Sequence, residues 1–448
     1  MPAEDNFVFA VELGSSKVVA TAGRKDPDGS IHVLGYAEKD ATPFISKGKI
    51  FNVDKMTNTI QMMREDMEKK LDKTISQVYV CHGGMGIHSV QHIVERNYSE
   101  QNKITDDVIS SIVSENASSV KDNKEIIQVV QQEYKVGTQS LLDVIGVESD
   151  NLQGKFLNLI CAPEIRRRIH DCFAKANLPI AGIELSTLQV SKLMLSDMEK
   201  QSGCVFVDMG AATTTVAVFS QNLLRHLVVL PLGGMNITKD LESLNISTAE
   251  AEELKLRYGI PQEDEIAEGE TLTLRDGRTI EMERYYELVI ARVEEILCNV
   301  AHQIEMSGSS KDNLIGGIIV TGRAANLKNI DKAIKEYTKF EKVSYVKIVK
   351  QNVRSGGHFN RNGEYNVVLS MIESATENCC GGSKDKGSGD IFQGKTVETA
   401  TADNSTEMPT EEKVPEIVEE EKPKKPNKVG GFFKKVSKVI GKIVNEDE

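Results

Sequence analysis

The chain begins with short apolar runs that are separated by turns, before any helical spacing appears. Residues 7–13 (FVFAVEL) predict a buried strand, and 17–22 and 31–36 predict two more strands around an Asp-Pro-Asp-Gly turn. Helical spacing follows at 52–71, and a further strand is predicted at 76–81. A hairpin ahead of the first helix is unlike a dinucleotide-binding domain, in which the first strand leads directly into a helix.

The opening pattern returns later in the chain. Residues 206–216 (FVDMGAATTTV) repeat the order of residues 9–19 (FAVELGSSKVV): a strand, an acidic residue, one residue, a glycine, a turn and a strand. This repeat predicts two related domains that face each other. Between them, residues 84–178 are more polar and mix predicted strands with a helix at 164–176, which is typical of an inserted domain.

Helical patterns dominate the part of the chain that follows the repeat. A helix is predicted at 236–244, and Ser247 with Glu250 has capping-box spacing at the start of another helix. A long amphipathic helix is predicted at 282–306, and a buried strand is predicted at 314–320. The pattern of the whole chain therefore predicts an α/β protein.

The composition excludes several classes of protein. With 54 Lys and Arg against 67 Asp and Glu, the formal net charge is −13, which disfavours general nucleic-acid binding. Seven scattered cysteines without a CxxC pair are typical of reduced cytosolic thiols, not of a disulfide framework or a zinc ribbon. Neither a secretory leader nor a window of about 18 apolar residues is present, so we expect a cytosolic chain that reaches a membrane only by attachment.

The two acidic-x-Gly turns carry the strongest chemical signal. Glycine lets the backbone approach a phosphate, hydroxyls add donors, and a carboxylate can hold the hydrated cation that accompanies phosphates. Because the two turns lie on matched strand–turn–strand frames, they predict a nucleotide tail bound from both sides. The first turn contributes Glu12, Gly14, Ser15, Ser16 and Lys17, and the second contributes Asp208, Gly210, Thr213 and Thr214.

Three further features are compatible with a nucleoside site. The pair Gly233-Gly234 opens a predicted helix, and Thr321-Gly322 ends a buried strand, where ligands of such sheets are found. Glu252 and Lys255 are three residues apart on the next helix and therefore share a face. Taken alone, this last pair is equally well explained as a solvated ion pair on a helix surface.

In their order along the chain, these motifs resemble the actin/sugar-kinase ATPase superfamily, and within it the FtsA family of bacterial cell-division proteins. The resemblance rests on FVFAVELGSSKVVA, VYVCHGGMGIHSV, LGGMNITKDL, AEELKLRYG, VTGRAANL and the C-terminal tail, and covers residues 6–375 and 428–444. It implies ATP and Mg as cofactors, with the two turns around the phosphates. The residues implied around the nucleoside are Gly233, Gly234, Glu252, Lys255, Thr321 and Gly322.

The resemblance also implies an α/β, actin-like two-lobed fold with an inserted small α+β domain, followed by a disordered linker and a C-terminal amphipathic helix. The expected boundaries are 1–83 and 179–200 for lobe 1 (1A), 84–178 for the inserted domain (1C), 201–242 and 310–378 for lobe 2 (2A), 243–309 for subdomain 2B, 379–428 for the acidic linker, and 429–445 for the membrane-targeting helix.

The last motif departs from the family pattern, because Arg323 follows Thr321-Gly322 where a second glycine is expected. Its long cation would either stack on the adenine or crowd it. Hydrolysis would need a group that orients the attacking water, and the candidates are Asp208 and Gln189. Gln189 is equally well explained as a helix-surface amide. We therefore expect at most a slow ATPase, and no metal held by a cluster of protein ligands alone.

The C-terminal segment has the clearest amphipathic pattern in the chain. At 100° per residue its apolar side chains share one face and its lysines another. So short a helix is marginal in water and should fold on contact, either with an anionic membrane surface or with a groove on a protein. We predict membrane binding, since the acidic linker has too few apolar residues to fold and disfavours self-docking. The predicted membrane-binding residues are Phe432, Phe433, Lys434, Lys435, Val436, Lys438, Val439, Ile440, Lys442, Ile443 and Val444.

The resemblance implies an ATP-binding adaptor that tethers FtsZ filaments to the membrane and helps assemble the division machinery. The implied partners are the FtsZ C-terminal tail, with Arg284 and Arg292 as candidate contacts, other division proteins through the inserted domain, further copies of the chain in filaments, and anionic lipids, but no nucleic acid. The expected location is the cytoplasmic face of the membrane at the division site. Two alternatives remain open: an actin-fold kinase acting on a small sugar or carboxylate, and a pilus or secretion assembly adaptor.

Overall fold

Two large β-sheets organise the part of the chain that the computed structural model describes, which comprises residues 7–119, 123–260, 269–345, 353–354 and 363–381. The first sheet has the strand order β12-β7-β1-β2-β3-β20. Strands β1 to β3 form the predicted antiparallel meander, whereas β1, β7 and β12 run parallel. The strands are β1 (Phe7–Leu13), β2 (Lys17–Lys25), β3 (Ile31–Asp40), β7 (Val78–His82), β12 (Ile180–Leu185) and β20 (Val353–Arg354).

Four helices pack around this first sheet. They are α1 (Val53–Leu71), α3 (Pro163–Lys175), α4 (Ser186–Met194) and α10 (Asn366–Ser374). Helix α1 begins as predicted, because the Asn52 side chain accepts a hydrogen bond from the Lys55 amide at 3.0 Å, and it buries a methionine-rich stripe that includes Met56 and Met63. Helix α10 contacts β1, β2 and α4, so a segment near the end of the described chain packs on the first sheet.

The second sheet has the strand order β10-β9-β11-β8-β15-β14-β13-β18-β19. Strand β15 of the second repeat pairs with β8 of the insertion at Val228 and His88, and the Leu227 amide donates to the Ser89 hydroxyl at 2.9 Å. The insertion therefore continues a sheet that begins in a distant part of the sequence. The strands are β8 (His88–Lys103), β9 (Glu125–Val136), β10 (Gln139–Leu141), β11 (Glu148–Cys161), β13 (Cys204–Met209), β14 (Thr214–Ser220), β15 (Leu223–Leu230), β18 (Ile318–Thr321) and β19 (Val343–Tyr345).

The inserted segment has a small core of its own. Helix α2 (Asp106–Ala117) contacts β8, and Ile112 of the helix packs with buried residues such as Val94 and Phe156. At the end of the helix the buried side chains of Asn116 and Asn158 bond each other in both directions, at 2.9 and 2.8 Å. These contacts satisfy polar groups that would otherwise be costly to bury.

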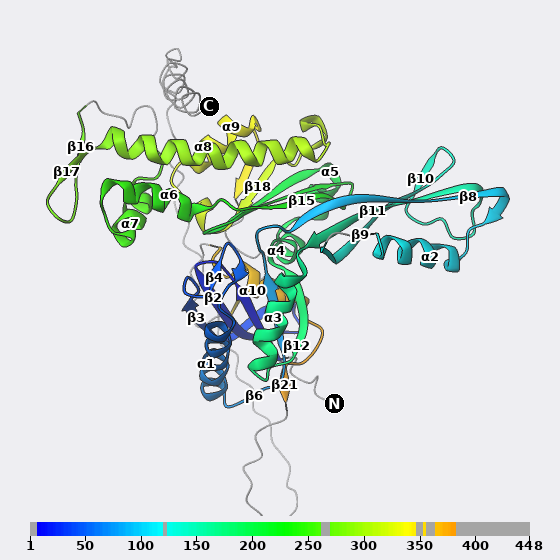
Figure 1. Cartoon of the computed structure of the whole chain (residues 1–448), viewed down its shortest axis with the longest axis horizontal. Helices are drawn as coiled ribbons and strands as arrows, with labels where there is room; N and C mark the ends of the chain where they lie inside the picture. The colour runs from blue at the N-terminus through cyan, green and yellow to red at the C-terminus, as the bar shows by residue number, and fades with distance from the viewer. Residues whose placement is uncertain (1–6, 120–122, 261–268, 346–352, 355–362, 382–448) are drawn as a thin grey trace, which may run out of the picture. The chain divides into compact units, whose positions relative to one another are not determined.

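The helical part of the second half agrees with the pattern in most places. Helix α8 (Met282–Met306) has the predicted bounds and lies beside α6 and α9 (Figure 1). The predicted helix at 236–244 is divided into α6 (Gly234–Leu241) and a 3-10 turn, η1 (Glu242–Leu244). Ser247 caps α7 (Thr248–Tyr258), but the Glu250 carboxylate accepts from the Arg275 amide, not from the cap. The remaining elements are β16 (Thr271–Thr273), β17 (Thr279–Glu281), η3 (Lys311–Asn313), η4 (Arg323–Asn326) and α9 (Ile330–Thr338).

The internal repeat is confirmed by strand register. In the hairpin β1–β2, Glu12 pairs with Val19, one residue before the strand ends. In the hairpin β13–β14, Asp208 pairs with Thr215 at the equivalent place. Each first strand also has a parallel neighbour, β7 for β1 and β18 for β13. Both carboxylates therefore lie at the carboxyl end of a central strand, where ligands of such sheets bind.

The predicted start of the linker at residue 379 is wrong. Cys379 is fully buried, its amide donates to the Phe7 carbonyl at 2.7 Å, and its carbonyl accepts from the Ser76 amide at 2.9 Å. The next two residues form β21 (Cys380–Gly381), which pairs with β6 (Thr74–Ile75). The remaining linker and the predicted helix at 429–445 lie outside the described residues. Two short strands, β4 (Ile45–Ser46) and β5 (Lys49–Ile50), complete the elements.

Truncation tests the role of this segment. A chain that ends at Asn378 should have a free energy of unfolding about 1–3 kcal/mol lower than a chain that ends at Ser383, because it loses the buried Cys379 side chain, the two backbone hydrogen bonds of that residue and the pairing of β21 with β6. The chain that ends at Ser383 is the control and should match the full chain. Urea unfolding measures the difference, and equal midpoints for the two truncated chains would contradict this expectation.

Within the described residues, the structure contains no helix that is both long enough and apolar enough to cross a bilayer.

Candidate functional site

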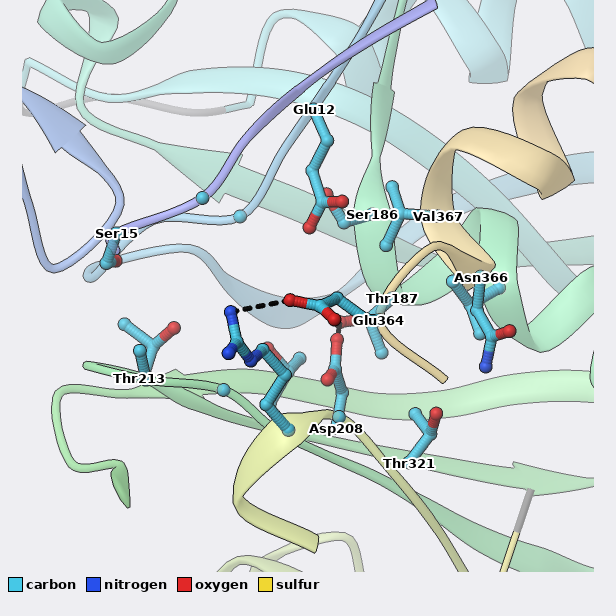
Figure 2. A pocket seen from close by; sticks show the side chains of 18 of the residues that line it. Glu12, Ser15, Ser186, Thr187, Asp208, Thr213, Thr321, Glu364, Asn366 and Val367 are labelled. Atoms are coloured by element: carbon cyan, nitrogen blue, oxygen red, sulfur yellow. Dashed lines mark hydrogen bonds and ion pairs between the residues drawn. The ribbon is translucent and has the colours of Figure 1, made fainter. Parts of the chain in front are cut away.

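Residues from both sheets line a pocket with two adjoining chambers. The first, here called the carboxylate chamber, contains Glu12, Asp208 and Glu364, which point toward a common space in Figure 2. The second, the helix chamber, has a volume of 810 Å³ and is bounded by α6, α7 and η4. Residues of both turns and Arg323 border both chambers, so the two chambers form one site.

Residues of the two predicted turns line the carboxylate chamber. A Cβ added to Gly14 would lie 2.6 Å from the Lys17 carbonyl oxygen, so only glycine closes this turn. In the second turn the Gly210 amide donates to the Thr213 carbonyl at 2.8 Å, and a Cβ there would lie 2.9 Å from the same oxygen. The predicted turn residues that line this chamber are Glu12, Gly14, Ser15, Ser16, Lys17, Asp208, Gly210 and Thr213. Thr321 and Gly322, which were predicted around the nucleoside, also line this chamber and do not line the helix chamber.

Three predicted site residues do not line either chamber. Thr214 is buried on β14, where side chains alternate between the two faces, and its neighbours Thr213 and Thr215 line the chamber in its place. Gly233 packs against the second turn, since a Cβ there would lie 2.7 Å from the carbonyl oxygens of both Gly210 and Ala211. Gln189, a predicted catalytic residue, is buried and accepts a hydrogen bond from the Ser374 hydroxyl at 3.3 Å, which joins α4 to α10.

Lys255 belongs to a buried network in the wall of the helix chamber. Its ammonium donates to the Gly234 carbonyl at 3.1 Å, to the Thr238 hydroxyl at 2.9 Å and to the Glu252 carboxylate at 2.6 Å. The Lys255 side chain is only 8% exposed, so the interpretation as a solvated surface pair is wrong for the lysine. Burial lowers the pKa of Lys255, and the hydrogen bond that its ammonium donates to Glu252 opposes that shift. The network holds α6 against α7.

The carboxylate chamber has more acidic charge than its cations balance. Burial raises the pKa of Glu12 to about 8, with repulsion from Asp208 and then Glu364 adding to the shift, while Arg323 opposes it. Burial also raises the pKa of Asp208, although the Thr187 hydroxyl donates to this carboxylate at 3.1 Å. A divalent cation would relieve this repulsion, so the chamber fits a cation that arrives with phosphates.

The donor set of the carboxylate chamber fits the coordination that magnesium prefers. Within the ranges that the structure describes, no three His, Cys, Asp or Glu side chains are grouped so that they could hold a metal ion. Magnesium keeps several waters and takes only one or two carboxylates together with substrate phosphates. Glu12 and Asp208 fit that requirement, and the glycine turns leave the backbone open to phosphates.

Several lining residues carried no signal in the sequence. Ser186 and Thr187 belong to the first turn of α4, which follows β12, and Glu364 lies just before α10. None of them belongs to a recognisable motif, because they reach the chamber only through the packing of α4 and α10 on the first sheet. Contact between the two halves of the pocket depends on them, since Thr187 bonds Asp208 and Glu364 pairs with Arg323.

The two arginines that were candidates for partner binding differ in their surroundings. Arg292 on α8 forms a two-pronged ion pair with Asp240 of α6, at 2.6 and 3.0 Å, and also contacts Glu295. The Arg284 side chain is 59% exposed and contacts Glu287 of its own helix at 2.9 Å. Arg292 therefore holds α8 to α6, and Arg284 is the more accessible cation of the two.

Comparisons with known proteins agree with this architecture. The family model described as "Cell division protein FtsA" matches residues 205–370. Curated relatives include the cell division protein FtsA of Porphyromonas gingivalis, 27% identical over 84% of this chain and 79% of the relative. Another is the cell division protein FtsA of Escherichia coli K12, 25% identical over 72% of this chain and 80% of the relative. The predicted resemblance to this family is confirmed.

A solved structure supports the fold independently of sequence. A chain of the PilM–PilN type IV pilus biogenesis complex superposes with a TM-score of 0.57 at 14% identity, over 82% of this chain and 97% of that chain. At this identity the likeness concerns the fold alone. The predicted actin-like α/β fold is confirmed for the described residues.

Proposed function

Because the chain resembles the FtsA family over most of its length, we propose that it is an ATP-binding, actin-like adaptor of bacterial cell division, attached to the cytoplasmic face of the membrane at the division site. The observation that carries the proposal is the position of Glu12 and Asp208. Two equivalent turns, one from each sheet, bring these carboxylates into one chamber. Such a pair suits a nucleotide held between two related halves.

In this proposal the two turns hold the phosphates of ATP and the helix chamber holds its nucleoside. Gly234, Glu252 and Lys255 would line the nucleoside, while Glu12 and Asp208 would hold hydrated Mg²⁺. The cation would neutralise charge on the phosphates and on these carboxylates. Since the chambers are lined from both sheets, a bound nucleotide would favour one arrangement of the two halves over others.

We propose at most slow hydrolysis for this site. Of the two predicted catalytic residues, Asp208 lines the carboxylate chamber. Gln189 accepts a hydrogen bond from Ser374, which joins α4 to α10. Asp208 is held in place by the Thr187 hydroxyl. The main role of the nucleotide would be to stabilise the form of the protein that assembles into filaments.

The proposed partners follow from the same resemblance. The exposed Arg284 would contribute to a site for the acidic C-terminal tail of FtsZ, and the inserted domain would contact other division proteins. The amphipathic segment 429–445 would attach the protein to anionic lipids, and further copies of the chain would bind to form filaments. Together these contacts would couple FtsZ filaments to the membrane.

Co-sedimentation with anionic liposomes tests the proposal. The full chain should pellet with vesicles and carry FtsZ with it, and a chain that ends at Asn427 should leave both proteins in solution. Ile440→Glu, on the apolar face of the predicted helix, should weaken lipid binding about tenfold or more, since it removes buried apolar area and adds a charge.

The outcomes separate the proposal from its alternatives. Neutral vesicles are the control and should bind the full chain more weakly, because they lack the attraction between lysines and anionic headgroups. If the full chain binds lipid but leaves FtsZ in solution, a pilus or secretion adaptor becomes the better hypothesis. If neither chain pellets, the membrane role is wrong, and a screen for sugar or carboxylate kinase activity would follow.

A further inference from the structure

Arg323 occupies the boundary between the two chambers of the pocket. It follows Gly322 directly after β18, and its side chain borders both the carboxylate chamber and the helix chamber. A nucleotide with its nucleoside in one chamber and its phosphates in the other would have to pass this side chain. Arg323 therefore controls the connection between the two halves of the site.

The partner of Arg323 comes from the opposite side of the pocket. Its guanidinium donates to the Glu364 carboxylate at 2.8 Å, the pair that the dashed line marks in Figure 2. Glu364 lies just before α10, which packs on β1, β2 and α4 of the first sheet, whereas Arg323 follows β18 of the second sheet. The ion pair thus joins the two sheets across the site.

The two members of the pair differ in exposure. The Glu364 side chain is 8% exposed, and the Arg323 side chain is 48% exposed. Arg323 can therefore leave into water at little cost, but a Glu364 carboxylate left without a cation would be costly. Lys17 can compensate the Glu364 carboxylate when Arg323 leaves, since the Lys17 ammonium lies 3.3 Å from Glu364 and 2.8 Å from Glu38. Opening the Arg323–Glu364 pair would leave Glu364 beside a second cation.

We infer that the Arg323–Glu364 pair is a latch that the phosphate chain of a nucleotide opens, so that the pocket selects nucleotides with two or more phosphates over nucleosides. This inference rests on the proposed nucleotide binding. It makes Arg323 a specificity-determining residue that binds phosphate oxygens after it leaves Glu364.

The chemistry of the guanidinium explains the selectivity. Its planar fork of donors matches phosphate oxygens as well as carboxylate oxygens, so a polyphosphate replaces the bond to Glu364 with an equivalent one. Arg323 also lines the helix chamber, so a nucleoside bound there would displace the same side chain but would offer it no anion in return. The opening of the latch is therefore compensated only when the ligand carries phosphates.

Calorimetric titration of the full-length protein with Mg²⁺ and ATP, ADP or adenosine tests the latch. In Arg323→Gly, adenosine should bind about fivefold more tightly because no latch has to open, and ATP should bind about tenfold more weakly because a phosphate contact is lost. The ratio of ATP to adenosine affinity should therefore fall about fiftyfold. In Glu364→Gln, ATP and adenosine should each bind about threefold to fivefold more tightly, so the ratio of their affinities should not change.

Glu373→Gln is the matched control, because Glu373 lies on α10 itself and pairs with Lys25 at 2.7 Å outside the chambers. It should leave all three affinities unchanged, and thermal unfolding should show that each variant folds. An equal change of ATP and adenosine affinity in Arg323→Gly would overturn the latch. If ATP binds to the Arg323→Gly variant but not to the natural protein, the latch is also wrong, because Arg323 would then only obstruct the site. If neither the natural protein nor any variant binds a nucleotide, the proposed function itself fails.

Discussion

Replacing Gly322 with alanine should weaken binding of ATP about 100-fold and lower the free energy of unfolding by about 2–4 kcal/mol. Gly322 has a φ of +92°, which an L-residue adopts only with strain. A Cβ at this position would lie 2.4 Å from the Met209 carbonyl oxygen and 2.7 Å from a carboxylate oxygen of Asp208. Relief of these clashes must move the end of β13, and with it the carboxylate that the site needs.

Calorimetric titration with Mg·ATP and urea unfolding measure the two effects. Gly83→Ala is the matched control, because Gly83 lines the same chamber but an added Cβ there would meet no described atom within 4 Å. This control should change the stability by less than about 0.5 kcal/mol and leave the affinity near that of the natural protein. Affinity for ATP that survives Gly322→Ala would show that the position of Asp208 does not matter for binding.

Glu12→Gln should change how stability depends on pH. The pKa of Glu12 is raised from 4.5 to about 8, so the folded protein holds this proton more tightly than the unfolded chain does. The stabilisation is therefore complete below pH 4.5 and is lost as the pH rises toward 8, at up to about 1.4 kcal/mol per pH unit. The variant lacks this slope, and near pH 8 it should be about 2–3 kcal/mol more stable than the natural protein.

Chemical denaturation at a series of pH values between 5 and about 8.5 measures this difference. Glu184→Gln is the control, since Glu184 lies on β12 outside the carboxylate chamber and should leave the slope in place. Mg·ATP should stabilise the natural protein more at high pH than at low pH, because the cation binds the ionised carboxylate. Parallel stability curves for Glu12→Gln and the natural protein would contradict this account of the chamber.

Elements with strong local signals could be predicted from the residues alone. Helix α8 has the predicted bounds because its apolar stripe runs without interruption through Tyr285, Val289 and Val293. The two acidic-x-Gly turns could be predicted because their hydrogen bonds are local, as in the bond between Gly210 and Thr213. Repetition of the same motif in a second hairpin then indicated that both turns act together.

Elements whose stability comes from distant partners could not be predicted in the same way. Strand β8 runs from His88 to Lys103, but Val94 is its one buried position, so its hydrophobic pattern is weak. Its pairing with β15 is specified by two segments that are far apart in the chain. Cys379 looks like the first residue of a polar linker, yet it is buried because Phe7 and Ser76 offer it backbone partners.

The composition of the site depends on both kinds of information. Local sequence was sufficient to identify Glu12 and Asp208, because each lies near the end of a buried strand and precedes a glycine turn. Only the tertiary structure could add Thr187 and Glu364, which reach the chamber through the packing of α4 and α10. A local motif specifies which chemistry a turn can perform. Charges from separate elements meet only when distant strands and helices pack together, and no short stretch of sequence contains that information.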